Sequence, residues 1–352
     1  MKHIRTLFRT LFAAILAAAL AACSPADSSP RPIRLSYSIF FPASHIQTRT
    51  AVEWAREIES RSSNRVSIAI YPFGSLTKPE QCWQGMLSGI SDLGMSCFSY
   101  TPGRFPLLEA LDLPLGWPDG LAATRVASAL AAKYEPAELR GAKLLYVHSH
   151  GPGVLATRAP VASLEDLHNR RIRGTGLSAG IISLLGATPV GMPQSETYDA
   201  LQKGVVEGTF CPVETLNGWK QGEVVRFVTP CPSVGYTTSM FVAMNRKKWD
   251  SLPPDIQQIF LDVSAEFVDR HGLAWNQADE EGWRFVESLG RTVSPLPPEE
   301  EARWAAAVEP LKKAYVERAA AKGLPGAEFL ADAEALLAAE KAKAAAAPEE
   351  NP

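Results

Sequence analysis

Three neighbouring arginines, Arg170, Arg171 and Arg173, give this chain a segment that could bind an anion. A guanidinium group presents its N–H donors in a planar fork, which fits the two oxygens of a carboxylate. If the segment is a strand, side-chain alternation places Arg171 and Arg173 on one face and Ile172 on the other. The pattern alone therefore selects no single arginine, and a solvated basic edge would look the same.

Residues 176–180 read GLSAG and fit G-x-S-x-G, the nucleophile-elbow pattern of serine hydrolases. Ser178 would be the nucleophile, and His271 follows it in the chain order that suits a general base. An elbow also needs a buried apolar strand before the serine, but residues 169–173 contain one apolar residue in five. An exported serine hydrolase that uses Ser178 is therefore kept only as an alternative.

Two further patterns could indicate a cofactor or a metal ion. Residues 174–180 are close to a dinucleotide-binding loop, and Glu196 lies 20 residues after Gly176, but the same polar segment precedes the loop. His148 and His150 form an H-x-H pair, yet no third ligand has a suitable spacing. We therefore expect the two histidines to share one face of a strand, and we predict no cofactor and no metal ion.

The N-terminal segment predicts export. Three cations precede a ten-residue apolar run at 11–20, which is too short to span a bilayer, where about 20 residues are needed. Leu-Ala-Ala then precedes Cys23, as at a bacterial lipoprotein cleavage site. We expect a lipoprotein-type signal peptide at 1–22, lipidation of Cys23 and a polar tether at 23–32; ordinary cleavage near Ala22 is the alternative. The mature chain would then be a periplasmic lipoprotein tethered to a membrane.

Charge and length exclude some classes of protein. The 352 residues carry a formal charge of −3, which becomes −6 once the three cations of the signal peptide are removed. A mildly acidic chain with no basic stripe is not expected to bind nucleic acid. The mature length of about 330 residues exceeds one typical hydrophobic core, so two domains are expected.

The cysteines that follow the signal peptide match no zinc-binding spacing. They are Cys82, Cys97, Cys211 and Cys231. An even number of cysteines in an exported chain permits a disulfide, and Cys211 with Cys231 is one candidate pair. Four buried free thiols fit the sequence at least as well.

Strand and helix patterns alternate along the mature chain. Apolar residues alternate with polar ones at 33–39, which predicts a strand, and apolar residues at spacings of 0, 3, 4 and 7 predict a helix at 51–58. Further strands are predicted at 66–70, 92–97, 144–147 and 240–244, and further helices at 79–87 and 256–267. A Gly-Pro-Gly sequence at 151–153 suits a crossing between domains. The alternation predicts α/β lobes with mostly parallel sheets, in which ligands bind beyond the carboxyl ends of strands.

The segment 192–214 carries the most specific sequence pattern. Tyr198, Leu201 and Val205 lie on one face of a predicted helix, which Gly204 ends. The sequence of residues 196–208, ETYDALQKGVVEG, resembles the signature of the solute-binding proteins of TRAP-type (tripartite ATP-independent periplasmic) transporters. Three more segments resemble that family in the same order: SLEDLHNRRIR at 163–173, LGATPV at 185–190 and NRKKWDSLPP at 245–254. By these motifs the chain is similar to the organic-acid-binding, DctP-like members of the family.

The resemblance implies a fold, an activity and partners. The fold is a two-lobed α/β periplasmic binding protein with a central cleft and a long helix that crosses both lobes. Lobe I would comprise 33–149 plus 237–285, and lobe II with the crossing helix 150–236 plus 286–330, before an alanine-rich C-terminal tail at 331–352. The protein would be no enzyme: it would capture a small organic acid and deliver it to the membrane subunits of a TRAP transporter. A binding protein of an ATP-driven importer is a second alternative.

The resemblance also implies a set of ligand-binding residues. In the family, the arginine that ends the strand of the motif found here at 163–173 binds the ligand carboxylate, and that position in this chain is Arg173. The other positions implied are Ser38, Phe40, Phe41, Cys97, Phe98, Phe210, Cys211, Glu214 and Tyr236.

One departure from the family suggests the kind of ligand. Sugar-acid binders of the family carry a second arginine after the crossing and an asparagine after the signature glycine. This chain has Gly-Val-Leu-Ala at 153–156 and Cys211 at roughly those places. We therefore expect a less polar pocket and a smaller or partly apolar ligand, such as a 2-oxo, 2-hydroxy or aromatic acid.

Overall fold

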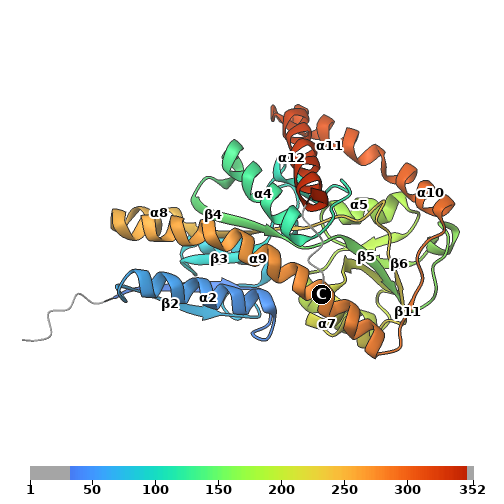
Figure 1. Cartoon of the computed structure of the whole chain (residues 1–352), viewed down its shortest axis with the longest axis horizontal. Coiled ribbons are helices and arrows are strands. Elements are labelled where there is room, and N and C mark those ends of the chain that lie inside the picture. The colour runs from blue at the N-terminus through green and yellow to red at the C-terminus, as the bar shows by residue number, and fades with distance from the viewer. Residues whose placement is uncertain (1–31, 347–352) are drawn as a thin grey trace, which may run out of the picture. The chain divides into compact units, whose positions relative to one another are not determined.

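The computed structural model describes residues 32–346, whose strands form two sheets (Figure 1). The signal peptide expected at 1–22, the expected lipidation of Cys23 and most of the expected tether at 23–32 lie outside the described residues. Within the described part, no helix is both long and apolar enough to cross a membrane.

The first sheet has five strands, which are those predicted from apolar periodicity at 33–39, 66–70, 92–97, 144–147 and 240–244. Its order is β2 (Val66–Tyr71), β1 (Ile33–Ile39), β3 (Leu93–Cys97), β10 (Ser239–Asn245) and β4 (Ala142–Ser149). The helices that follow these strands or precede them are α2 (Ile46–Arg61), α3 (Cys82–Ser88), α4 (Gly120–Tyr134) and α8 (Arg246–Asp250). The helix predicted at 79–87 begins with a 3₁₀ turn at Pro79–Gln81, continues as α3 and ends at Gly89, which has a φ of 81°.

The second sheet has six strands, several of which are too short to give a sequence pattern. Its order is β11 (Thr292–Val293), β9 (Phe227–Thr229), β5 (Gly153–Thr157), β8 (Gly208–Pro212), β6 (Arg171–Arg173) and β7 (Thr188–Val190). Its neighbouring helices are α5 (Leu177–Leu184), α6 (Gln194–Gln202) and α7 (Glu214–Gly218). Short 3₁₀ turns occur at Phe98–Tyr100, Leu108–Asp112, Ala137–Leu139, Glu165–Leu167 and Gln221–Glu223.

Each sheet contains one strand that opposes its neighbours. β10 is antiparallel to β3 and β4, and β5 is antiparallel to β8 and β9, whereas β1 pairs with β3, and β6 with β7 and β8, in parallel. Both opposing strands follow a crossing between the sheets: the chain leaves β4 for β5, and leaves β9 for β10. A strand that begins at the crossing must run away from it, whereas the other strands run toward it. The expectation of mostly parallel sheets therefore holds with one antiparallel strand in each.

A single long helix, α9 (Pro254–Ser288), extends along both sheets (Figure 1). It packs against α2, α4 and β4 of the first sheet and against α7 of the second. Two glycines allow the close approach: a Cβ on Gly272 would lie 2.9 Å from the Cα of Leu121, and one on Gly282 would lie 2.6 Å from the carbonyl oxygen of Val213. The two-lobed α/β fold with a crossing helix, expected from the sequence, is confirmed.

The C-terminal part of the described chain is helical. α10 (Pro298–Val308), α11 (Pro310–Ala321) and α12 (Gly326–Ala346) follow β11 (Figure 1). α12 packs on α4 and α11 and buries Phe329 and Leu337. The segment from 331 that we expected as an alanine-rich tail is thus a packed helix as far as Ala346, because its apolar residues recur at helical spacing.

Two local expectations need correction or completion. The helix of the signature segment ends at Gln202, so that Val205 lies beyond it and is 47% exposed rather than on the buried face. Gly204 adopts a φ of 71° and turns the chain away before that residue. The four described cysteines are buried free thiols, so Cys211 and Cys231 form no disulfide.

We predict that Gly272→Ala destabilises the protein by a net ~1–2 kcal/mol, because the added methyl group would press on the backbone of Leu121 at a cost near the upper end of the ~1–3 kcal/mol typical of overpacking. The gain in helix propensity from glycine to alanine, about 1 kcal/mol, is too small to offset that overpacking. Urea unfolding measures the difference. Gly191→Ala is the control, since nothing lies within 4 Å of a Cβ there; equal stability of the two variants would contradict the prediction.

Candidate ligand-binding site

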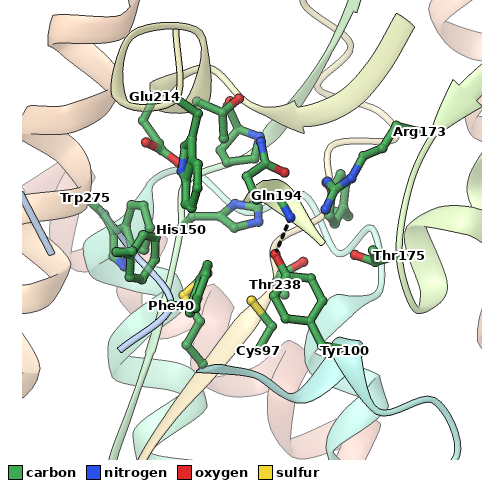
Figure 2. A pocket seen from close by; sticks show the side chains of 16 residues that line it. Phe40, Cys97, Tyr100, His150, Arg173, Thr175, Gln194, Glu214, Thr238 and Trp275 are labelled. Carbon is green, nitrogen blue, oxygen red and sulfur yellow. Dashed lines mark hydrogen bonds between the residues drawn. The ribbon is translucent and has the colours of Figure 1, made fainter. Parts of the chain in front are cut away.

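A cavity lies where the strands of both sheets end, with about 360 Å³ of empty space when its opening to solvent is included (Figure 2). β1 ends just before Phe40, β3 ends at Cys97, β6 ends at Arg173 and β8 ends at Pro212, and all four of these residues line the cavity. This placement follows the general rule that α/β sheets bind ligands beyond the carboxyl ends of their strands. The full lining consists of Phe40, Phe41, Cys97, Tyr100, His150, Arg173, Thr175, Gln194, Pro212, Glu214, Thr215, Trp219, Tyr236, Thr238, Met240 and Trp275.

Arg173 is the cationic centre of the cavity. Its side chain is 3% exposed, and its Nε and Nη2 donate to the carbonyl oxygen of Met192 at 3.1 and 3.0 Å. Within residues 32–346 no carboxylate lies within ion-pair distance of it, and Nη1 has no hydrogen-bond acceptor. A buried charge is costly unless an opposite charge and hydrogen bonds compensate it. The arginine therefore keeps donors for an anion in the cavity (Figure 2).

The start of α6 lies beside this arginine. The backbone N–H of Gln194 donates to the hydroxyl of Tyr100 at 3.1 Å, which joins the second sheet's helix to the 3₁₀ turn after β3 (Figure 2). Burial raises the pKa of Tyr100 well above its usual range, so the phenol stays neutral. The side-chain Nε2 of Gln194 is buried and has no acceptor among the described residues. Such an amide can interact with an oxygen of a molecule in the cavity.

Aromatic rings form the opposite wall. Phe40 and Trp219 stack with centroids 6.1 Å apart and planes 17° apart, and Phe40 also meets Tyr100 edge-on at 5.5 Å. Phe41 packs edge-on against Trp275 at 5.7 Å. Phe40 and Trp275 lie across the cavity from Arg173 (Figure 2). The site therefore has one cationic end and one apolar, aromatic end.

A buried hydrogen bond between a histidine and a glutamate joins the two sheets at the edge of the cavity. His45, the N-cap of α2, accepts a hydrogen bond from the N–H of Gln47 at Nδ1, so its proton resides on Nε2. Nε2 then donates to Glu214 at 2.8 Å, and the two side chains are 1% and 3% exposed. Because α2 belongs to the first sheet and Glu214 begins α7 of the second, this bond holds the two lobes together.

The structure brings together six of the ten residues expected to bind the ligand. Phe40, Phe41, Cys97, Arg173, Glu214 and Tyr236 line the cavity. Ser38 instead bonds to Thr77 within the first lobe, at 2.6 Å between the hydroxyl oxygens. Phe98, Phe210 and Cys211 pack into hydrophobic core clusters. Ser38, Phe210 and Cys211 lie within β1 and β8, whereas the cavity lies past the strand ends. Phe98 lies in the 3₁₀ turn after β3, and its ring packs against Phe105 and Phe241.

Several lining residues were not expected from the sequence. Gln194 lies at the start of the signature segment 192–214 and Trp219 lies shortly after its end, so both could have been found from their positions in the chain. Trp275 lies in the middle of α9, where it reads as an ordinary core residue of an amphipathic helix. His150 was noted only as half of an H-x-H pair; its partner His148 is buried and bonds to the indole N–H of Trp275 at 3.0 Å.

The site also accounts for the glycine after the crossing. A Cβ on Gly153 would lie 2.5 Å from the ring of Tyr236, so this ring occupies the space of any side chain there. The hydroxyl of Tyr236 bonds to the carbonyl oxygen of Phe210 at 2.8 Å and fixes the ring. An aromatic surface thus stands where an additional polar side chain would otherwise project.

The residues of the hydrolase alternative do not form a catalytic arrangement. The hydroxyl of Ser178 donates to the carbonyl oxygen of Thr175 at 2.7 Å. His271 bonds instead to Gln47 and to Tyr146, at 3.0 Å between Nε2 and the hydroxyl oxygen. Across residues 32–346 no group of three or more His, Cys, Asp or Glu side chains could hold a metal ion.

A carboxyl group of α9, that of Asp279, lies beside the hydrogen bond between His45 and Glu214. The N–H of Glu214 donates to Asp279 at 3.2 Å, and a Cβ on Gly151 would lie 2.1 Å from the other oxygen of Asp279. Burial, followed by the negative charge of Glu214, raises the pKa of Asp279 to about 8. This carboxyl therefore carries a proton over much of the neutral range.

The comparison with family models gives one match. The model described as bacterial extracellular solute-binding protein, family 7 (DctP), matches residues 37–319. Among known proteins, the C4-dicarboxylate-binding periplasmic protein DctP of Rhodobacter capsulatus is 26% identical over 298 residues, which cover 83% of this chain and 89% of the relative.

Two solved structures are similar over nearly their whole length. One is a TRAP solute-binding protein from Rhodoferax ferrireducens in complex with copurified benzoate, at 27% identity and a TM-score of 0.84, covering 89% of this chain and 100% of that one. The other, from an unidentified marine microbe, is described as specific for aromatic acid ligands and contains 3-hydroxybenzoate. It is 28% identical, with a TM-score of 0.82, and the match covers 88% of this chain and 99% of that one.

The raised pKa of Asp279 predicts a pH dependence of stability. Between its ordinary pKa of 3.8 and about 8, the folded protein keeps a proton that the unfolded chain has released, so this group lowers stability as pH rises through that window. Asp279→Asn retains an oxygen for the N–H of Glu214 and removes the ionisation. The variant should therefore gain thermal stability over the wild type at pH 8 relative to pH 5. The exposed neighbour substitution Glu280→Gln should leave the dependence unchanged, and parallel pH profiles for Asp279→Asn and wild type would refute the assignment.

Proposed function

The chain belongs to family 7 of the bacterial extracellular solute-binding proteins, and on this premise we propose that it captures a small organic acid for a TRAP-type secondary transporter. The single observation that carries the proposal is the buried guanidinium of Arg173, which faces a cavity and has no carboxylate partner in the described chain. A ligand carboxylate would supply both the missing charge and the acceptors. The low dielectric of an enclosed cleft strengthens such a pair relative to one at the surface.

The charge and shape of the lining favour a monocarboxylate with an apolar body. Among residues 32–346, Arg173 is the one arginine or lysine that lines the cavity, so a second carboxylate on the ligand would meet no matching cation there. The acidic side chain of Glu214 would repel it. Phe40, Trp219 and Trp275 offer ring surfaces instead, which suit an aromatic acid. The benzoate and 3-hydroxybenzoate of the two structural relatives agree with this class.

Capture would use closure of two lobes about the crossings. We assign 33–149 plus 237–285 to lobe I and 150–236 plus 286–330 to lobe II. The bonds of His45 with Glu214 and of Gln194 with Tyr100, and the stacking of Phe40 on Trp219, exist only when the lobes are together. A ligand that contacts both lobes would stabilise that state through the same contacts.

The proposed role is binding without catalysis. The family and the fold are those of binding proteins. Neither the serine hydrolase that would use Ser178 nor a binding protein of an ATP-driven importer is supported by these relatives. The proposed partners are the organic acid, the integral membrane subunits of the transporter and a lipid anchor.

The family places the protein outside the cytoplasm, and we propose that Cys23 anchors it to a membrane there. The sequence reasons are the short apolar run, the Leu-Ala-Ala before the cysteine and the polar tether after it. Each CH₂ group of an acyl chain that is buried in the bilayer contributes about 0.8 kcal/mol of binding free energy, so two or three chains hold a protein stably on a membrane.

The arginine assignment predicts that Arg173→Ala weakens binding of benzoate or a related monocarboxylate by about 30-fold or more, because removing one partner of a buried charge pair costs about 2–5 kcal/mol. Isothermal titration calorimetry measures the affinities, with succinate included as a dicarboxylate. Arg171→Ala is the matched control: this arginine lies two residues earlier on the same strand, is exposed and bonds to Gly204. Retained binding in Arg173→Ala, or equal losses in both variants, would refute the assignment.

The anchor predicts that Cys23→Ser abolishes lipid attachment, since serine offers no thiol for acylation. Detergent-phase partition and incorporation of labelled palmitate report the attachment in cells. Cys82→Ser serves as control, because that thiol is buried in the first lobe. A Cys23→Ser protein that still incorporates palmitate would exclude this anchor.

A further inference from the structure

His150 is held in one protonation state and one tautomer at the wall of the cavity. It directly follows β4, and its side chain is 3% exposed. Its Nδ1 lies 2.6 Å from the carbonyl oxygen of Gly151. A carbonyl oxygen only accepts hydrogen bonds, so Nδ1 must carry the proton and Nε2 must present its lone pair.

The ring stays neutral at physiological pH. Burial, together with the positive charge of Arg173, lowers the pKa of His150 to about 4, although its bond to Gly151 acts in the opposite direction. Nε2 is therefore an acceptor and not a donor when the protein works near neutral pH.

The ring is fixed by its neighbours. It meets Tyr236 edge-on at 5.5 Å with planes 88° apart and Trp275 at 6.1 Å with planes 72° apart. Its own carbonyl oxygen accepts a hydrogen bond from Thr237. No described residue donates to Nε2, and this atom is not among the fully enclosed polar atoms that lack a partner. Because the residue lines the cavity, the space open to Nε2 is the cavity itself (Figure 2).

We propose that His150 determines specificity by accepting, at Nε2, a hydrogen bond from a hydroxyl or N–H group of the ligand whose carboxylate binds Arg173. The inference rests on the proposed function and narrows it from monocarboxylates to those with a donor on their body, such as hydroxylated aromatic acids or aryl 2-hydroxy acids. A parent acid without the donor leaves a buried acceptor unsatisfied, and sites built to bond a ligand hydroxyl reject such analogues strongly.

The other polar groups of the lining discriminate less. The hydroxyls of Tyr100, Thr175 and Thr238 can donate or accept, so they tolerate a donor or an acceptor on the ligand. Glu214 is also an acceptor, but one of its oxygens already bonds to His45. Apart from the hydroxyls, Glu214 Oε1, the side-chain oxygen of Gln194 and Nε2 of His150 are thus the side-chain acceptors of the lining to which no described residue donates, and only that of His150 belongs to a ring fixed between Tyr236 and Trp275.

The test compares matched acids by calorimetry on the full chain. The pairs are benzoate with 2-, 3- and 4-hydroxybenzoate, phenylacetate with mandelate, and 3-hydroxybenzoate with 3-methoxybenzoate, which accepts but cannot donate. In the wild type, at least one donor-bearing acid should bind tenfold or more tightly than its partner. In His150→Phe, which keeps an aromatic ring, that ratio should fall to within twofold, whereas the control Arg171→Ala should preserve it.

The outcomes separate this inference from the proposed function. Ratios within twofold for every pair in the wild type would overturn the role of His150 and leave capture of monocarboxylates intact. Absence of binding by all of these acids would overturn both. Loss of the ratio in Glu214→Gln together with its retention in His150→Phe would assign the discrimination to Glu214 and refute the proposal.

A spectroscopic readout decides the matter even if His150→Phe fails to fold. In wild-type protein labelled with ¹⁵N-histidine, Nδ1 of His150 should appear protonated and Nε2 unprotonated at pH 7. The Nε2 resonance should move toward lower frequency with the preferred donor-bearing acid and stay in place with its parent. A protonated Nε2, or equal shifts with both acids, would overturn the proposal.

Discussion

The buried guanidinium of Arg173 is the interaction on which the site depends. A cation enclosed to 97% with no carboxylate partner in the described chain is costly, and the carbonyl oxygen of Met192 satisfies only one side of its fork. The remaining donors are useful only when an anion enters the cavity. Stability and ligand capture are thus linked through one side chain, because whatever compensates this charge also favours the state in which the two lobes meet.

The neighbouring groups leave that charge unopposed. Burial raises the pKa of the Asp112 carboxyl group well above its usual range, and it raises the pKa of the Cys97 thiol in the same way. His150 stays neutral for the reverse reason, since its pKa falls to about 4. The acid in the lining, Glu214, is bonded to His45. The cavity therefore presents one cation, a fixed hydrogen-bond acceptor and aromatic surface. This combination selects ligands first for a negative charge and second for a hydrogen-bond donor.

Much of this arrangement could be predicted from the sequence. Strand alternation and helical spacing located the main elements of the first lobe, and four ordered motifs indicated the family. The same patterns could not separate Arg173 from Arg171, since both point to one face of a strand. Phe210 and Cys211 were expected in the cavity because they follow the signature glycine, yet β8 continues through both and the cavity begins at Pro212. Val205 was expected on a helix that ends three residues earlier.

The sequence by itself determined the main strands and helices of the first lobe and the presence of arginines suited to a carboxylate, because these depend on local spacing and residue chemistry, and its ordered motifs indicated the two-lobed class through the family resemblance. The tertiary structure decided which side chains share the cavity. Trp275 from the middle of α9, His150 from the crossing and Gln194 from the start of α6 meet there although they lie far apart in the chain. Their meeting depends on where strands end and how closely α9 packs, which are properties of long-range contacts that no local pattern contains.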